Sequence, residues 1–242
     1  MNLIVDVGNS FIKLAVFKGG VLVEKKIVAV NDFEVTFTEL QQSFPKITQA
    51  IVSSVGDFSD ANRLLLKKFN KVHFLSHESK VPFINTYETP KTLGVDRIAL
   101  VSAAALKYPN QNVLVIDVGS CITYDILNRN NEYLGGAISP GITMRYKAMH
   151  EFTAKLPLLE ITLPMTLLGT TTQSSMNVGV IQGVSNEVDG FISAYKNHFS
   201  DLTTILTGGD VHFLRDSIKN DIFAHSNFLL EGLNHILEIN NN

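Results

Sequence analysis

Two stretches of this chain place an aspartate, a glycine and short polar side chains directly after an apolar run. The first is residues 4–10, IVDVGNS, with Lys13 three positions further on, and the second is residues 115–121, VIDVGSC. In such a turn the glycine lets the backbone approach a ligand closely, and turn N–H groups and hydroxyl side chains bind phosphate oxygens. We therefore expect a phosphate-binding hairpin that occurs twice in the chain.

Each hairpin also has a plain structural interpretation. An Asp-x-Gly sequence is common in ordinary turns, and most lysines lie on solvent-exposed surfaces. The repetition favours function, since similarly spaced strands follow both turns. Phosphoryl transfer depends on positioning and on cations that stabilise the transferred oxygens. Lys13 is then the candidate cationic group, and Asp6 and Asp117 are candidates for binding a metal ion or its water shell.

A further set of polar residues lies at 85–90, NTYETP, and 93–97, LGVDR. Asp96 stands at the start of a predicted helix, where it either caps the helix or acts as a general base for a substrate hydroxyl. Arg97 is either a surface residue or a donor to polar groups of the substrate. The residues by themselves leave both pairs of alternatives open.

The elements that must position these residues follow from the spacing of apolar side chains. The first half predicts strands at 3–7, 11–17, 21–30, 50–54 and 71–75 and helices at 33–44 and 59–69. The second half repeats the three-stranded meander at 113–118, 122–127 and 132–139, and continues with helices at 140–150 and 175–199, a strand at 203–207 and two closing helices. A helix at 95–107 carries alanines at 103–105, which suit tight packing against a neighbour. We expect an α/β chain of two domains, residues 1–108 and 109–242, each with a mixed sheet of the β-β-β-α-β-α-β type.

Composition argues against several classes of function. The 242 residues carry a formal net charge of −3 without a long basic run, so we expect no nucleic-acid partner. No apolar run approaches the roughly 18 residues that span a bilayer, so we expect no membrane partner. The single cysteine, Cys121, is consistent with a reducing compartment, and we expect a cytoplasmic protein. Neither the Walker pattern nor the dinucleotide glycine fingerprint occurs, which disfavours P-loop and Rossmann folds.

Taken in order, the motifs resemble those of the type III pantothenate kinases. The resemblance rests on residues 6–10 with Lys13, 93–97, 117–120, 135–136, 139–141 and 207–209, and it includes 152–157 and 169–179. It implies two duplicated ribonuclease H-like domains with an interdomain cleft, the fold of the acetate kinase, sugar kinase, Hsp70 and actin superfamily. It also implies transfer of the γ-phosphoryl group of ATP to pantothenate, the first step of coenzyme A biosynthesis. The family acts as a homodimer that needs Mg²⁺ with ATP and a monovalent cation, K⁺ or NH₄⁺.

The resemblance implies roles for individual residues. ATP would be bound by Asp6, Val7, Gly8, Asn9, Ser10, Phe11, Ile12, Lys13 and Ser120. Pantothenate would be bound by Tyr87, Gly94, Val95, Asp96, Arg97 and Thr172, with Asp96 as the catalytic proton acceptor. The run Thr170-Thr171-Thr172 leaves the exact threonine open to a shift of one. Asp117 would bind K⁺ or NH₄⁺, and Asp6 would belong to the shell of Mg²⁺. Ser10 stands where the family commonly has Thr, and Ser120-Cys121 replaces a frequent Thr-Ala; both keep a hydroxyl group.

Two other functions compete with this interpretation. One is phosphorylation of a different small molecule by a kinase of the same superfamily. The other is a regulatory protein that binds nucleotide without turnover, since members of the family were also called Bvg accessory factors. The chain has no basic patch or helix-turn-helix pattern, which speaks against direct DNA binding.

Overall fold

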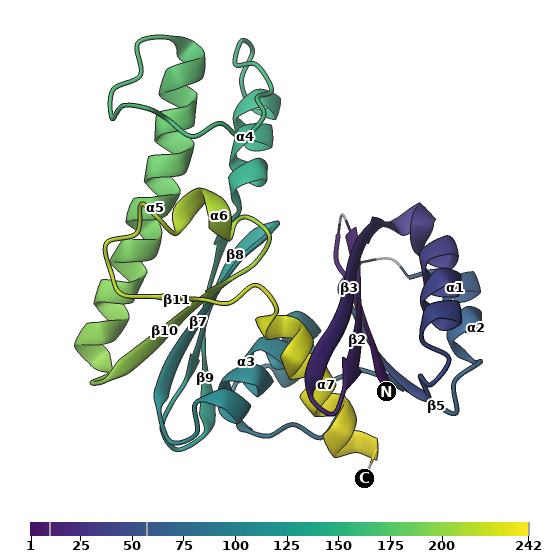
Figure 1. Cartoon of the computed structure of the whole chain (residues 1–242). Helices are drawn as coiled ribbons and strands as arrows, with labels where there is room; N and C mark the ends of the chain where they lie inside the picture. Colours follow the sequence, from purple (N-terminus) through teal and green to yellow (C-terminus); the bar gives the residue numbers. More distant parts are fainter. Residues whose placement is uncertain (10, 57, 242) are drawn as a thin grey trace. The chain divides into compact units, whose positions relative to one another are not determined.

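The structure is a computed structural model that describes residues 1–9, 11–56 and 58–241 (Figure 1). The chain forms two compact units, one made of Met1–Pro109 with Asn227–Asn242 and the other of Asn110–Ser226. The sequence-based division at 108/109 differs in its treatment of residues 227–242, which it assigns to the second domain. In the structure these residues belong with the first unit.

The first unit has a five-stranded mixed sheet. Its elements are β1 (Asn2–Val7), β2 (Phe11–Lys18), β3 (Val21–Ala29), α1 (Phe33–Ser43), β4 (Gln49–Ser54), α2 (Asp60–Leu66) and β5 (Lys71–Phe74). The strand order is β3-β2-β1-β4-β5, with β1 antiparallel to β2 and parallel to β4. Every residue of β1 is buried, as expected for a central strand covered on both faces. The core on one face is formed by phenylalanines of α1 with apolar residues of β1 and β2.

Two further helices of the first unit pack against each other. They are α3 (Val95–Lys107) and α7 (Phe228–Asn241), and α3 follows the short strand β6 (Ile84–Asn85) and the 3₁₀ turn η2 (Pro90–Thr92). Gly232 of α7 lies so close to α3 that a Cβ there would come within 1.9 Å of the Ala99 carbonyl oxygen and 3.2 Å of the Ala103 Cβ. Ala103, the first alanine of the small face predicted at 103–105, therefore packs against α7. This contact, between helices far apart in the chain, is why residues 227–242 belong to the first unit.

The second unit repeats the sheet of the first. Its elements are β7 (Asn112–Val118), β8 (Cys121–Leu127), β9 (Glu132–Pro140), α4 (Ile142–Glu151), α5 (Thr172–His198), β10 (Leu202–Thr207), α6 (Val211–Leu214) and β11 (Phe223–Ala224). The order β9-β8-β7-β10-β11 matches β3-β2-β1-β4-β5 strand for strand, including the antiparallel β7–β8 and parallel β7–β10 pairs. The predicted duplication and mixed-sheet fold are confirmed.

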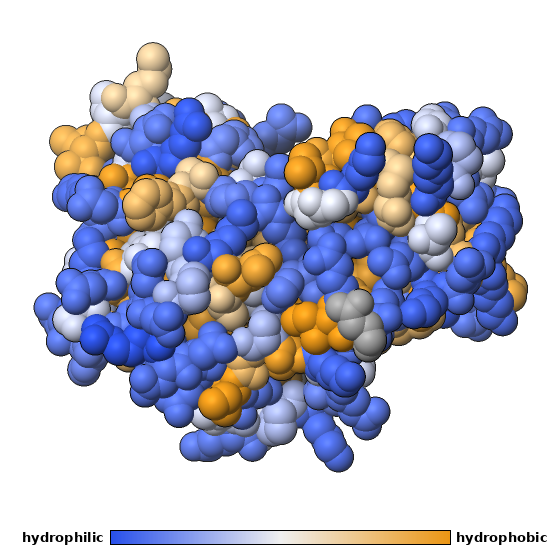
Figure 2. Space-filling model, turned by 60° about the horizontal axis from the view of Figure 1, so that its bottom comes forward, coloured by the Kyte–Doolittle hydropathy of each residue, from blue (hydrophilic) through white to orange (hydrophobic). Residues whose placement is uncertain are grey.

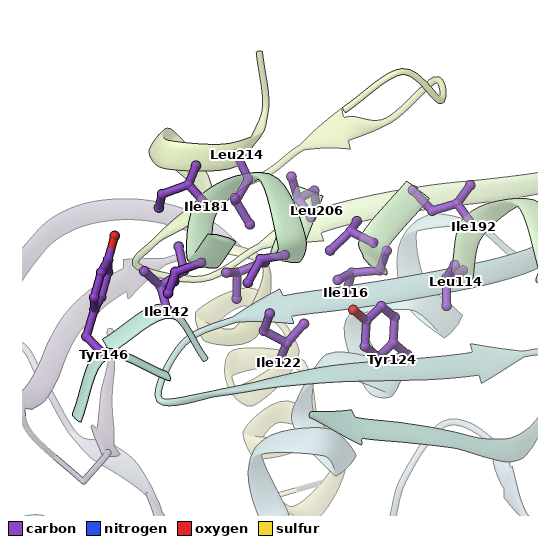
Figure 3. Close-up of a cluster of buried hydrophobic side chains, with 14 of the residues drawn as sticks. Leu114, Ile116, Ile122, Tyr124, Ile142, Tyr146, Ile181, Ile192, Leu206 and Leu214 are labelled. Carbon is purple, nitrogen blue, oxygen red and sulfur yellow. The ribbon is translucent and has the colours of Figure 1, made fainter. Parts of the chain in front are cut away.

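The core of the second unit lies between this sheet and α5 (Figure 3). Ile116 of β7 and Ile122 of β8 face Ile181 and Ile192 of the helix, and all four side chains are buried. α5 begins at Thr172, earlier than predicted, because Thr171 and Ser174 form a reciprocal capping box. The hydroxyl of Thr171 is thereby engaged in the cap.

The surface in Figure 2 is mostly polar, with apolar residues in small separate groups. Within the described ranges, no helix has both the length and the apolar character required to span a membrane.

Candidate functional site

The first predicted phosphate hairpin is the turn between β1 and β2. Asp6 and Lys13 are direct partners across this hairpin, and Lys13 Nζ lies 3.3 Å from Asp6 Oδ2. The N–H of Gly8 donates to the Phe11 carbonyl at 3.0 Å and closes the turn. Ser10, a predicted ATP contact, lies outside the described residues. The hairpin thus presents a paired carboxylate and ammonium group at the base of a glycine turn.

The carboxyl group of Asp6 is buried in this hairpin, and its pKa is shifted. Burial raises the pKa of Asp6, whereas the charge of Lys13 and its hydrogen bond lower it and the charge of Asp96 raises it. The net pKa lies above its ordinary value, because the carboxylate is removed from water. The contribution of Asp96 shows that the start of α3 lies within electrostatic range of the hairpin. Asp96, which the sequence places in a separate motif from Asp6 and Lys13, therefore lies within electrostatic range of Asp6.

A glycine that the sequence reasoning missed supports the same turn. A Cβ at Gly56, just after β4, would come within 2.3 Å of the Gly8 carbonyl oxygen. Its N–H and that of Val55 both donate to the Val7 carbonyl, at 3.2 and 3.1 Å. Only a residue without a side chain permits this approach of two backbones. The available signal was a glycine following the predicted strand at 50–54.

Asp96 is not the N-cap residue of α3. The N-cap residue is Gly94, and Asp96 lies in the first turn, where its Oδ1 accepts a hydrogen bond from the Arg97 N–H at 2.8 Å. A Cβ at Gly94 would come within 2.3 Å of that same Oδ1. Val95, another predicted contact, is the first residue of the helix. The glycine therefore leaves room for the Asp96 carboxylate.

Arg97 is not a surface residue. It is 4% exposed, and its guanidinium carbon lies 5.7 Å from the ring centroid of Tyr87. This distance is within the range of a cation–π interaction. Two of the residues predicted to bind substrate are thus in contact at the start of α3.

The second hairpin, between β7 and β8, also has a glycine turn, which is one residue shorter than the first. The Gly119 N–H donates to the Cys121 carbonyl at 3.0 Å. Asp117 pairs with Thr123 on β8 and with Thr207 on β10, so the three side chains lie side by side on one face of the sheet. Thr123 is 8% exposed, and its hydroxyl has no hydrogen-bond partner among the described residues.

A glycine again lies against this hairpin after the parallel neighbouring strand. Gly208 has φ 111°, and a Cβ there would come within 2.2 Å of the Val118 carbonyl oxygen and 2.6 Å of Asp117 Oδ1. Gly208 directly follows β10 and packs on the end of β7, whereas Gly56 is the second residue after β4 and packs on the turn itself. Thr172, a predicted substrate contact, is the first residue of α5 in this unit.

Few oxygen atoms near the two hairpins are available to bind a metal ion. Over residues 1–9, 11–56 and 58–241, no three His, Cys, Asp or Glu side chains are grouped so that they could hold a metal ion. Asp6 offers a buried carboxylate near a second one at Asp96. Asp117 with Thr123 and Thr207 offers hard oxygen donors of the kind that Mg²⁺, Ca²⁺ and alkali cations accept.

Comparison with solved structures shows that other proteins share this fold. A Baf family protein from Campylobacter jejuni superposes with a TM-score of 0.65 at 23% identity, covering 99% of both chains. A glucokinase from an Antarctic psychrotroph superposes with a TM-score of 0.52 at 13% identity, covering 98% of both chains. At these identities the likeness concerns the fold alone.

Comparison of sequences is more specific. The chain is 48% identical over 233 residues to a type III pantothenate kinase of Flavobacterium johnsoniae, covering 96% of both chains. It is 50% identical over 240 residues to that of Christiangramia forsetii, covering 99% of both. The family model for type III pantothenate kinase matches residues 2–194, which include both glycine hairpins and the start of α3. With this match, the chain belongs to the type III pantothenate kinase family.

Proposed function

We propose that this chain transfers the γ-phosphoryl group of ATP to pantothenate, giving 4'-phosphopantothenate for coenzyme A biosynthesis. The observation that carries the proposal is that Asp96 lies within electrostatic range of Asp6, which is paired with Lys13 at the first glycine hairpin. A carboxylate that can accept a hydroxyl proton lies near a cation and a turn suited to phosphate. Family membership supplies the identities of the two substrates.

In the proposed reaction Asp96 accepts the proton of the pantothenate hydroxyl as that oxygen attacks the γ-phosphorus. Lys13 stabilises the charge on the phosphate oxygens, and the turn at Gly8 supplies backbone N–H groups. The proposed ATP contacts are Asp6, Val7, Gly8, Asn9, Ser10, Phe11, Ile12, Lys13 and Ser120. The proposed pantothenate contacts are Tyr87, Gly94, Val95, Asp96, Arg97 and Thr172.

The cations are part of the same proposal. Asp6 belongs to the shell of Mg²⁺, which commonly binds through one or two carboxylates, waters and substrate phosphates. Asp117 binds K⁺ or NH₄⁺. The buried, unpartnered hydroxyl of Thr123 beside Asp117 supports a cation at this position, because an unsatisfied buried oxygen is costly unless a ligand reaches it.

A second copy of the chain is the proposed partner, and the segment between α4 and α5 is its proposed contact surface. Large apolar side chains there are strongly exposed, among them Phe152 at 85%, Met165 at 99% and Leu168 at 78%. A monomer rarely leaves such a group in water. Met165→Glu with Leu168→Glu should give a monomer in sedimentation, whereas Val21→Glu, at an exposed apolar position of β3, should leave a dimer. A double variant that remains dimeric would contradict this surface.

We place the protein in the cytoplasm, with no nucleic-acid or membrane partner. The decisive experiment incubates purified protein with ATP, Mg²⁺, K⁺ and pantothenate and measures phosphopantothenate by mass spectrometry. Product at catalytic turnover supports the proposal. Nucleotide binding without any product would favour the regulatory alternative, and transfer to another small alcohol in preference to pantothenate would favour a different kinase of the superfamily.

A further inference from the structure

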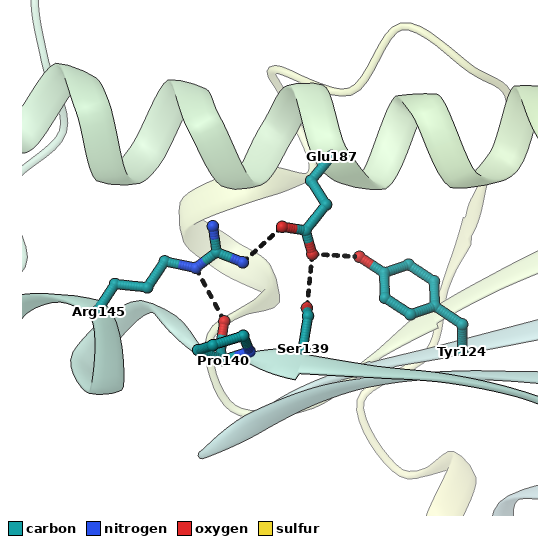
Figure 4. Close-up of polar contacts among 5 residues, drawn as sticks. All are labelled: Tyr124, Ser139, Pro140, Arg145 and Glu187. Carbon is teal, nitrogen blue, oxygen red and sulfur yellow. Dashed lines mark hydrogen bonds and ion pairs between the residues drawn. The ribbon is translucent and has the colours of Figure 1, made fainter. Parts of the chain in front are cut away.

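Glu187, in the middle of α5, accepts hydrogen bonds from side chains of three other elements of the second unit (Figure 4). Its Oε1 accepts from Tyr124 on β8 at 3.1 Å and from Ser139 on β9 at 2.5 Å. Its Oε2 lies 2.6 Å from Nη2 of Arg145 in α4. One carboxylate therefore joins two strands and two helices.

Arg145 extends this junction to the backbone between β9 and α4. Its Nε donates to the Pro140 carbonyl at 2.9 Å, so the guanidinium holds both the Glu187 carboxylate and the last residue of β9. The next residue, Gly141, touches the second glycine hairpin. Its N–H donates to the Ser120 carbonyl at 3.1 Å, and a Cβ there would come within 2.1 Å of the Gly119 carbonyl oxygen. The Glu187–Arg145 pair thus holds the segment that supports the Gly119–Ser120 turn.

Glu187 keeps its charge at neutral pH. Burial by itself raises the pKa of Glu187, but hydrogen bonds from Ser139 and Arg145 and the charge of Arg145 lower it more, so the net pKa is below its ordinary value. The Arg145 and Glu187 side chains are 23% and 25% exposed, so the pair is largely buried and joined to a hydrogen-bond network. Its effect on stability must therefore be measured separately from its effect on the turn.

We propose that Glu187 is a positioning residue for the ATP-binding turn at Gly119 and Ser120, acting through Arg145 and the backbone of Pro140 and Gly141. This inference rests on the proposed function, in which Ser120 contacts ATP. Removing the charge of Glu187 releases Arg145 and lets the supporting segment, and with it the turn, shift. Because misplacement of a contacting group by about 1 Å can cost on the order of 10²-fold in rate, a smaller shift here should raise the KM for ATP by roughly 10-fold.

The test compares Glu187→Gln with Asp189→Asn, two nearly isosteric variants on α5. Asp189 is a matched control, since its carboxylate also accepts several hydrogen bonds, but from Lys219 and Asn220 instead of the hairpin support. We expect Glu187→Gln to raise the KM for ATP without raising that for pantothenate, and to reduce the thermal protection given by a non-hydrolysable ATP analogue. Asp189→Asn should lower the melting temperature and leave both ATP measurements unchanged.

If Glu187 only stabilised the fold, both variants would have a lower melting temperature and unchanged ATP measurements. That result, or equal effects of the two variants on the KM for ATP, would overturn the inference. If the wild-type protein transfers no phosphoryl group, the proposed kinase activity fails by itself. The difference in nucleotide protection between the two variants still decides the role of Glu187.

Discussion

The Asp96 carboxylate lies in the space toward which a side chain on Gly94 would project, with its Oδ1 only 2.3 Å from the position of a Cβ. Gly94 has φ −58° and ψ 135°, a conformation that any residue can adopt. The glycine is therefore needed for the space it leaves. Its replacement should move the flexible carboxylate and leave the backbone in place.

Gly94→Ala should for this reason reduce kcat by on the order of 10²-fold, as expected when a reacting group is displaced by about 1 Å. The melting temperature should change little. Gly183→Ala on α5 is the matched control, because a Cβ there meets no atom within 4 Å. That variant should stabilise the protein by about 0.5–1 kcal/mol and leave kcat unchanged. Full activity of Gly94→Ala would contradict the proposed geometry.

Asp96→Asn tests the proton acceptor directly. The Asn side-chain oxygen can still accept from the Arg97 N–H, so only the charge in the first turn of α3 is lost. That loss should cost at most about 1 kcal/mol of stability. If Asp96 is the general base, turnover should fall by roughly 10²- to 10⁴-fold with the fold intact by circular dichroism. A variant with wild-type turnover would refute the role.

Lys13→Ala should weaken the use of ATP, since it removes the cation opposite Asp6. We expect a raised KM for ATP and also a loss of stability, because the change takes the Lys13 partner away from the buried Asp6 carboxylate, whose side chain is 7% exposed. Lys26→Ala breaks the exposed Lys26–Glu39 pair on the neighbouring strand and should leave the KM for ATP unchanged. Steady-state kinetics of the two variants side by side decide whether Lys13 acts on phosphate or only on the hairpin.

Asp117→Asn should abolish stimulation by K⁺, and Thr123→Val should weaken it. Thr123→Val also removes a buried hydroxyl without a partner, so in the absence of K⁺ it should raise the free energy of unfolding by about 1 kcal/mol. Thr204→Val is the control, because Thr204 is likewise buried with an unpartnered hydroxyl but pairs with Leu114. It should give the same stabilisation and normal dependence on K⁺, measured by activity and by the shift of melting temperature with K⁺.

Acid should destabilise the protein partly through Asp189. Burial by itself raises the pKa of Asp189, but hydrogen bonds from Lys219 and Asn220 lower the pKa by more than burial raises it. The native pKa therefore lies below the ordinary 3.8. The native state then binds fewer protons than the unfolded state, and the stabilisation is fully present above pH 3.8 and lost as pH falls through the native pKa. Urea unfolding between neutral pH and pH 3 should show a smaller loss of stability in Asp189→Asn than in wild type. Equal losses would contradict this account.

Much of the fold was predictable because its signals are local. The two glycine turns, the alternating strands beside them and the helix at 95–107 all follow from short-range periodicity, and the structure has Val95–Lys107 as α3. The repeat of the meander was visible for the same reason. The sequence also singled out the residues proposed here to carry chemistry, since Asp6, Lys13 and Asp96 each stand in a recognisable motif.

Tertiary structure alone decided how these residues are combined. The electrostatic effect of Asp96 on Asp6, the backbone contact of Gly56 with Gly8 and the packing of Gly232 on Ala99 join positions far apart in the chain. Glu187 likewise reaches Arg145 across an intervening segment. Such contacts leave no periodic pattern in the sequence, because they depend on how completed strands and helices pack. The sequence by itself determined the motifs and the duplicated sheets, and packing determined which motifs became neighbours and which glycines hold them in place.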